Sequence, residues 1–424
     1  MSFAVIVFIL LLCLAIGLPV AFSLFFSSLI GILLTSQSLF IIPHVVYSAL
    51  DNFVLLAIPL FIFMGHIMLE GGIGETIFDW ANVWLRHLPG GLVLASILSC
   101  ALFAAISGSS VATALTIGIV AFPAMVARGY QKEFVLGALA AGGTLGIIIP
   151  PSIPLILYGT ITEESVGKLF IAGIIPGIVI VSYLMIYSIV ACSKNPRLYT
   201  KVPPSSWKER WEKTIVFIPI LSLPVIVIGG IYTGIFTPTE ASAVGVICSY
   251  LTCMKKLGFR DIIDILKRTA KTSIMLLSIV AGAKLFGHVM ATMQVAQNLT
   301  KFVIQLQVQP WMFIVFVMIL LIILGALLDP AGIILITTPI FLPILQTLGI
   351  DLIYFGVIFT VNMELANVTP PVGMNLFVLS GIMEGVRYED VVRGVIPFII
   401  VLALGFVTVV LFPTLSTWLP TYAK

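Results

Sequence analysis

The sequence predicts an all-α polytopic membrane protein built from two inverted-topology repeats, each with five spans and a re-entrant hairpin. Of the 424 residues, 60% are hydrophobic and 9% are charged, and the mean hydropathy is +1.21. This composition excludes a soluble globular domain. Two apolar runs are interrupted by Pro-Pro pairs that begin at Pro150 and Pro370, 220 residues apart, and two long apolar segments show about the same offset.

Apolar stretches long enough to span a bilayer fall into two sets in chain order. They cover about residues 3–22, 24–43, 52–70, 133–160 and 167–193, and then 214–232, 238–254, 272–293, 352–383 and 394–415. The first begins at Phe3 without a basic n-region, so we expect a retained span rather than a cleaved signal peptide. Because five crossings is an odd number, a second repeat in the same order begins on the opposite face and is inverted.

Between the third and fourth span of each set lies an apolar stretch too long for one crossing. Residues 92–126 centre on Ser107 to Thr113, and residues 310–346 centre on Gly325 to Gly332. Small and hydroxylic residues at these centres favour a turn, so we expect each stretch to enter and leave on one side of the membrane. The charged segment from Glu70 to His87, which contains two tryptophans, is typical of an amphipathic helix at the interface.

The distribution of lysine and arginine predicts the orientation. With the N-terminus outside, Lys168, Lys301 and Lys424 lie outside and Lys284 lies within a span, which leaves 17 of the 21 basic residues for cytoplasmic segments. The positive-inside rule favours this orientation over its reverse. We therefore expect both termini outside, the first hairpin opening from the cytoplasm and the second from the outside.

The two interruptions, Gly142 to Ser152 and Asn367 to Gly373, contain glycines and adjacent prolines. Both residue types destabilise a helix, and proline also removes a backbone donor, so main-chain carbonyls are left without partners. Such a break persists at membrane depth only where protein buries it or where it lines a water-filled cavity. A matched pair of breaks in two halves of a chain indicates the binding site of a secondary transporter.

Six motifs carry a family resemblance, and they occur in the order Gly17 to Phe22, Ile58 to Gly65, Ser107 to Ala114, Gly142 to Ser152, Tyr232 to Val244, and Thr369 to Gly373. Together they resemble the DctM-like large membrane subunit (permease) of tripartite ATP-independent periplasmic (TRAP) transporters, over essentially the whole chain. The resemblance implies a sodium-coupled secondary active importer of an organic acid anion, such as a C4-dicarboxylate or a sialic acid. It places the protein in the bacterial inner membrane, where the outside termini predicted from the distribution of basic residues would be periplasmic.

The resemblance also implies partners and a mechanism. The partners are a periplasmic substrate-binding protein and a small membrane subunit of four helices, which we expect as a separate chain because no spare helices are predicted here. The mechanism is an elevator, in which hairpins and broken helices form a transport domain that moves against a scaffold. The expected segments are 1–91 (first scaffold spans and arm helix), 92–160 (first hairpin and broken helix), 161–213 (last span and cytoplasmic linker), 214–309 (second scaffold spans and arm), 310–383 (second hairpin and broken helix) and 384–424 (last span and C-terminus).

Sodium ions are the coupling ions that we expect, with no other cofactor and no transition metal. Hairpin tips and unwound carbonyls supply oxygen ligands for sodium without a full buried charge. The expected ligands are Ser107, Ser110, Thr144 and Gly146 in one site, and Gly325, Asp329, Thr369 and Gly373 in its twin. The alternative is that these small residues only permit close packing of membrane helices.

An anionic substrate is expected at the same breaks, because half-helix N-termini and backbone N–H groups present positive dipole ends. The expected substrate-binding residues are Pro150, Pro151, Ser152, Asn362, Asn367, Pro370, Pro371 and Asn375.

Four charged residues inside or beside the spans have two interpretations each. Asp329 either strengthens a cation site or, as we favour, caps the helix that begins at Pro330; Glu240 is expected to cap rather than couple. For Glu364, orienting the second break and binding an ion both stay open. Lys284 either pairs with an acidic group or, as we favour, extends towards the interface.

Other function classes fit the sequence less well. The absence of a GxxxxGK[ST] motif argues against an ATP-driven pump, and nothing indicates nucleic acid as a partner. An intramembrane serine protease would pair Ser107, in Ala105 to Gly108, with a base such as His288 in a later span. The sequence shows two symmetric breaks instead and leaves His288 unmatched. We therefore expect no enzyme. A stand-alone sodium-coupled carboxylate symporter, needing no binding protein, is the alternative function.

Overall fold

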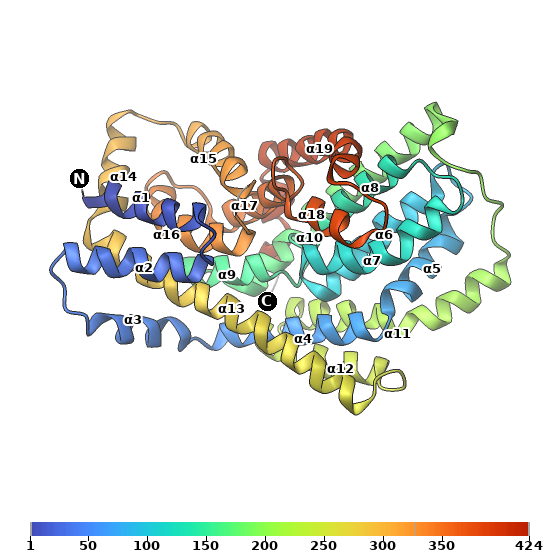
Figure 1. Cartoon of the computed structure of the whole chain (residues 1–424), viewed down its shortest axis with the longest axis horizontal. Helices are drawn as coiled ribbons and strands as arrows, with labels where there is room; N and C mark the ends of the chain where they lie inside the picture. Colours follow the sequence, from blue (N-terminus) through green and yellow to red (C-terminus); the bar gives the residue numbers. More distant parts are fainter. Residues whose placement is uncertain (1, 327, 423–424) are drawn as a thin grey trace.

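The computed structural model in Figure 1 describes residues 2–326 and 328–422. Leu327, inside the second predicted hairpin turn, and Lys424, one of the lysines expected outside, are not among the described residues. The described part of the chain is helical and has no β-strands. The prediction of an all-α protein is thus confirmed.

The elements of the first half are α1 (Ser2–Ala15), α2 (Val20–Leu34), α3 (Ile41–Leu50), η1 (Phe53–Leu56), α4 (Ala57–Glu70), α5 (Ile73–Leu85), α6 (Gly91–Ser107), α7 (Ser110–Val126), α8 (Lys132–Thr144), α9 (Ile153–Thr162), α10 (Val166–Lys194) and η2 (Pro196–Leu198). Those of the second half are α11 (Trp207–Tyr232), α12 (Pro238–Cys253), α13 (Phe259–Thr292), α14 (Val295–Gln305), α15 (Pro310–Gly325), α16 (Pro330–Thr347), α17 (Leu352–Asn367), α18 (Met374–Ile382), α19 (Tyr388–Leu411), α20 (Thr414–Thr417) and η3 (Leu419–Tyr422).

Six helical segments are long and apolar enough to cross a membrane: η1 with α4, α10, α11, α13, α16 and α19. The limits predicted for the first two spans are wrong. The helix α1 ends before Gly17, which has a φ of +84°, and α2 ends before Ser36, which has a φ of +54°. These left-handed residues end the helices, so the predicted span 24–43 covers a loop between α2 and α3.

The predicted hairpins correspond to pairs of helices that pack against each other, α6 with α7 and α15 with α16. The turn of the first pair consists of Gly108 and Ser109; Gly108 has a φ of +61°, and the Ser109 hydroxyl accepts from the N–H of Ala112 at 3.4 Å, capping α7. The predicted interfacial helix corresponds to α5.

Helices of the two halves interleave in two groups. In one, the 34-residue helix α13 packs on α2, α3 and α4, and α12 packs on α4 and α11. In the other, α19 packs on α8, α18 on α7, α15 on α17 and α16 on α9. Gly137 of α8 and Gly394 of α19 bring their helices so close that a Cβ on either would overlap the backbone of the other.

The arm helix α5 is fixed to α11. The indole N–H groups of Trp80 and Trp84 both donate to the hydroxyl of Thr214 at 3.2 Å. Just beyond α5, the Arg86 guanidinium makes two 3.0 Å bonds to the Glu209 carboxylate. Since α5 also packs on α6 and α7, it joins the first hairpin to a long helix of the other group.

Candidate functional site

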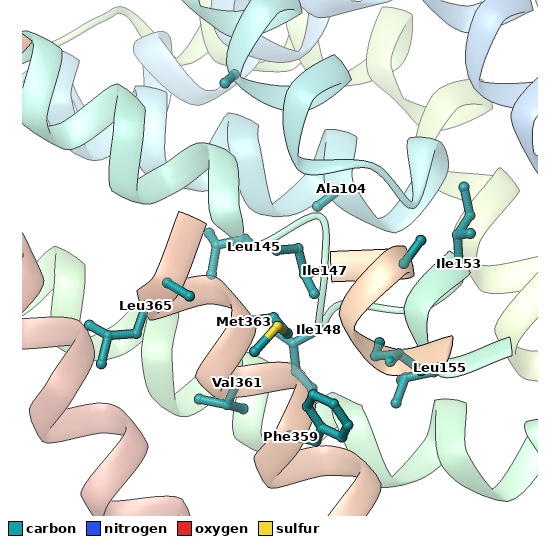
Figure 2. Close-up of a cluster of buried hydrophobic side chains, with 14 of the residues drawn as sticks. Ala104, Leu145, Ile147, Ile148, Ile153, Leu155, Phe359, Val361, Met363 and Leu365 are labelled. Atoms are coloured by element: carbon teal, nitrogen blue, oxygen red, sulfur yellow. The ribbon is translucent and has the colours of Figure 1, made fainter. Parts of the chain in front are cut away.

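Two broken helices lie at the centre of the fold. The first break separates α8 from α9, the second separates α17 from α18, and both Pro-Pro bonds are cis. Figure 2 shows the two broken helices packed together among buried apolar side chains, with Ile148 of the first break beside Met363 of α17. Protein buries the first break almost completely, whereas Pro370 of the second break is half-buried and Pro371 is exposed.

In the first break, prolines free two carbonyl groups. A helical N–H donates to the carbonyl four residues earlier, so Pro150 and Pro151 remove the donors for Gly146 and Ile147. The Ser152 hydroxyl donates to the Ile147 carbonyl instead. No described residue donates to the Gly146 carbonyl, which leaves this oxygen available for a cation.

The second break repeats this pattern. Pro370 and Pro371 remove the donors for Ala366 and Asn367. The N–H of Thr369 donates to the Ala366 carbonyl at 3.1 Å, while the Asn367 carbonyl accepts from none of the described groups. Each break thus presents one free backbone oxygen beside a polar loop.

The tip of the first hairpin touches the first break through its backbone. A Cβ built on Gly146 lies 2.5 Å from the carbonyl oxygen of Ser109, and one built on Gly108 lies 2.5 Å from the carbonyl oxygen of Pro151. Only glycine permits these approaches. The predicted grouping of Ser110 with Gly146 therefore corresponds to a close contact between hairpin and break.

The hydroxyl groups of the first predicted sodium set point to different partners. Ser107 Oγ lies 3.1 Å from Thr113 Oγ1, and Thr144 Oγ1 donates to the Ala141 carbonyl at 2.7 Å. Ser110 Oγ accepts from the Asn367 amide at 3.2 Å, which links the first hairpin to the second break. Sequence reasoning missed Thr113, although it ends the hairpin motif.

The second predicted set is spread over the hairpin and the break. Gly325 lies against Ala366 of α17. Thr369 Oγ1 donates to the Leu365 carbonyl at 2.6 Å, and Gly373, with a φ of +52°, precedes α18. Asp329 Oδ2 accepts from the Gly332 N–H at 3.0 Å, so Asp329 caps α16. No hydrogen bond joins Gly325, Asp329, Thr369 and Gly373 to one another.

Two of the predicted substrate-binding asparagines are held by helix backbones. Asn362 donates to the Met318 carbonyl at 2.9 Å, and Asn375 donates to the Ala140 carbonyl at 3.2 Å. Their amide oxygens are buried and have no partner among the described residues. Each therefore crosslinks two helices and retains one free acceptor.

The predicted substrate-binding prolines and Ser152 occupy three environments. Pro150 lines an apolar cavity of about 610 Å³ between α6, α10 and α11. Ser152 caps α9. Pro370 is half-buried and Pro371 is exposed, and the Pro371 carbonyl accepts from the Tyr388 hydroxyl at 2.7 Å. Tyr388 begins the helix after α18 and carries no local sequence signal for contact with the break.

The charged residues of the spans differ in their partners. Glu240 and Thr237 form a capping box at the start of α12. Glu364 is 1% exposed, and both its carboxyl oxygens lack a partner in the described part of the chain. Lys284 forms no ion pair with residues 2–326 or 328–422. His288 lines the same cavity as Lys284, and no hydrogen bond joins it to Ser107.

Metal-ligating side chains do not gather. Within the described ranges, no three His, Cys, Asp or Glu side chains lie close enough to hold an ion. The oxygen atoms at the breaks come instead from backbone carbonyls, hydroxyls and amides. Such neutral ligands suit a monovalent cation at membrane depth.

An all-helical fold with paired broken helices defines a polytopic membrane transporter. Solved structures share this fold: the Alcanivorax borkumensis YdaH transporter aligns with a TM-score of 0.60 at 14% identity, covering 89% of each chain. MtrF of Neisseria gonorrhoeae aligns with a TM-score of 0.58 at 13% identity, covering 91% of this chain and 84% of that one. At these identities the likeness concerns the fold alone.

Sequence comparison identifies the family. The family model "Tripartite ATP-independent periplasmic transporter, DctM component" matches residues 7–415. The C4-dicarboxylate TRAP transporter large permease protein DctM of Pseudomonas aeruginosa is 41% identical, covering 88% of this chain and 87% of that protein. The sialic acid TRAP transporter large permease protein SiaM of Vibrio cholerae is 34% identical, covering 95% of both. The chain belongs to the DctM component family of TRAP transporters.

A fused relative shows a second arrangement. The isethionate TRAP transporter permease protein DctMQ of Oleidesulfovibrio alaskensis is 36% identical over 94% of this chain, which covers 63% of that protein. The resemblance inferred from the six sequence motifs is confirmed by these matches.

Proposed function

We propose that this chain is the large permease subunit of a TRAP transporter that imports an organic acid anion together with sodium ions. The anion is a C4-dicarboxylate, a sialic acid or a similar carboxylate, as the names of relatives indicate for those proteins. A periplasmic substrate-binding protein delivers it, and a separate small membrane subunit completes the transporter in the inner membrane.

The free carbonyl oxygens of Gly146 and Asn367 carry the sodium part of this proposal. Each lies four residues before a proline, Pro150 for Gly146 and Pro371 for Asn367, so the helical donor to that carbonyl is missing. The same two residues contact the first hairpin tip, Gly146 through the backbone of Ser109 and Asn367 through its amide bond to Ser110. One sodium ion binds among the first set of predicted ligands and another among the second, in sites that protein carbonyls and hydroxyls complete.

The anion binds where two short helices begin. The N-termini of α9 and α18 adjoin the two breaks, and a helix N-terminus presents N–H groups and a positive dipole end to a carboxylate. The free amide oxygens of Asn362 and Asn375 accept hydrogen bonds from hydroxyl groups of the substrate or from bound water. Sodium neutralises part of the negative charge at membrane depth.

The two groups of interleaved helices support an elevator mechanism. The hairpins and broken helices form the transport domain, and α2, α3, α4, α11, α12 and α13 form the scaffold. The order of elements supports inverted repeats, because α11 to α19 follow the sequence of long helix, arm, hairpin, broken helix and long helix that α1 to α10 introduce. Both chain termini face the periplasm.

Reconstitution tests this function. The chain and its small partner are placed in proteoliposomes, and uptake of succinate or N-acetylneuraminic acid is measured with the binding protein outside, with and without an inward sodium gradient. We expect uptake only when sodium and the binding protein are both present. Sodium-driven uptake without the binding protein would instead establish the stand-alone symporter, and uptake that ignores sodium would refute the coupling.

A further inference from the structure

Three adjoining cavities lie along the C-terminal part of α13, where it packs against α3 and α16 (Figure 1). Their volumes are about 340, 470 and 340 Å³, and His288 lines all three. Lys284 lines the first and third, and His44 lines the second and third. The volumes fall within the range of small-molecule sites. In the orientation proposed above, this end of α13 faces the periplasm.

The cavities are lined by basic groups without acidic partners. None of the described residues around them is an aspartate or glutamate. The half-buried Lys284 ammonium forms no hydrogen bond or ion pair with a described residue, and His288 Nε2 is a buried atom without a partner. An unpaired ammonium near membrane depth is costly, so this space favours an anion.

The first cavity also touches the end of α9 that lies away from the first break. Its far wall consists of Pro339 and Pro343 of α16 and Ile161 of α9. Ile161 lies in the last turn of α9, whose first turn follows Ser152 in the first break. With ten residues, α9 is about 15 Å long. An anion in the cavity is therefore one short helix away from the proposed transport site.

We propose that Lys284, His288 and His44 form a vestibule that captures a carboxylate on the periplasmic side before it reaches the breaks. The vestibule lies between α3 and α13 on one side and the second hairpin with α9 on the other. This deepens the proposed function and rests on it, because it supplies the first contact of the same substrate. A phospholipid phosphate shares the anion chemistry, so the test separates the two sources.

Charge-selective labelling tests the vestibule without requiring transport. Ser48 is exposed and lines the third cavity with Lys284, and Ser48→Cys offers a thiol there. Four of the natural cysteines are buried and one is half-buried. Labelling of the natural chain therefore gives the background rate. The reaction rates of membrane-impermeant methanethiosulfonates, one anionic (ethylsulfonate) and one cationic (ethyltrimethylammonium), are measured on spheroplasts.

We expect the anionic reagent to react faster from outside. Two unit charges roughly 8 Å apart in water change each rate about 2.4-fold in opposite directions, so for a separation of this order Lys284→Gln lowers the anionic-to-cationic ratio about sixfold. Lys284→Arg preserves the ratio. Lys301→Gln, on the exposed face of α14 and outside the three cavities, is the control for net charge and leaves the ratio unchanged. A ratio insensitive to Lys284, or a thiol unreactive from outside, overturns the vestibule.

Protection identifies the source of the anion. In nanodiscs of phosphatidylcholine, millimolar succinate or N-acetylneuraminate is expected to slow labelling of Ser48→Cys, and Lys284→Gln to abolish that protection. Slowing only when phosphatidylglycerol is added would overturn the carboxylate assignment in favour of a lipid. Labelling does not require uptake, so the two proposals can fail separately. If the protein transports but its labelling shows no charge selectivity, the vestibule is refuted. If labelling is charge-selective but no uptake occurs, the proposed function is refuted.

Discussion

Replacing Gly146 with alanine tests the contact between the first hairpin and the first break. The added methyl carbon would lie 2.5 Å from the Ser109 carbonyl oxygen and 2.8 Å from the Ser110 nitrogen, whereas ordinary contacts begin at 3.4 Å. The hairpin tip must therefore retreat by about 0.9 Å. Both partners are backbone atoms, so no side-chain rotation relieves the overlap.

That displacement has a measurable size. Overpacking of this kind costs about 1–3 kcal/mol, and each 1.4 kcal/mol corresponds to about tenfold in affinity. If the overpacking destabilises the sodium-bound state and not the sodium-free state, the sodium concentration that gives half-maximal uptake rises about 5- to 150-fold. We expect Gly146→Ala to show this shift in proteoliposome uptake measured across a range of sodium concentrations.

A matched variant controls for glycine replacement itself. Gly381 lies in α18, and a Cβ built on it meets nothing within 4 Å, so Gly381→Ala is expected to keep the sodium dependence and to gain helix stability. Thermal melting of each purified variant separates a folding defect from a binding defect. A sodium dependence like that of the natural chain in folded Gly146→Ala would refute the assignment of this contact to an ion site.

Three further substitutions address other contacts. Asn367→Ala removes the bond to Ser110, and a double-mutant cycle with Ser110→Ala on the free energy of sodium binding should give a coupling of about 0.5–1.5 kcal/mol; additive effects would contradict the link. Gly394→Ala forces α8 and α19 apart and should lower the free energy of unfolding by about 1–3 kcal/mol, or more, in thermal melts, where an unchanged melting temperature would count against the close approach. Thr214→Val removes the acceptor of two arm indoles and should increase hydrogen exchange in α5, while equal protection in both proteins would show that the bonds contribute little.

The hydropathy of the sequence and its repeated pattern of apolar runs predicted the broad architecture, because the lipid bilayer constrains the length of each run. A lipid environment demands apolar runs of fixed length, so the hairpins and broken helices were visible as departures from that length. The Pro-Pro pairs predicted the breaks since proline lacks an N–H wherever it lies. Capping by Asp329 and Glu240 was likewise predictable, because a cap is read from three or four neighbouring residues.

Contacts between distant segments were not predictable in the same way. The bond from Asn367 to Ser110 joins residues 257 positions apart, and no local pattern specifies which hydroxyl an amide will meet. Tyr388 reaches the second break for the same reason. The ends of α1 and α2 were missed because Gly17 and Ser36 interrupt apolar runs whose average hydropathy remains high.

The hydrogen bond between Asn367 and Ser110 links the second break to the tip of the first hairpin, and so links the two proposed ion sites. A cation bound at one proposed site orders this hydrogen-bonded segment. The second cation then binds to a segment whose ordering cost has already been met. By thermodynamic reciprocity each ion then strengthens the binding of the other. For the two sodium sites that we propose, this hydrogen bond therefore predicts a sigmoidal dependence of uptake on sodium concentration, with little uptake until both ions are bound.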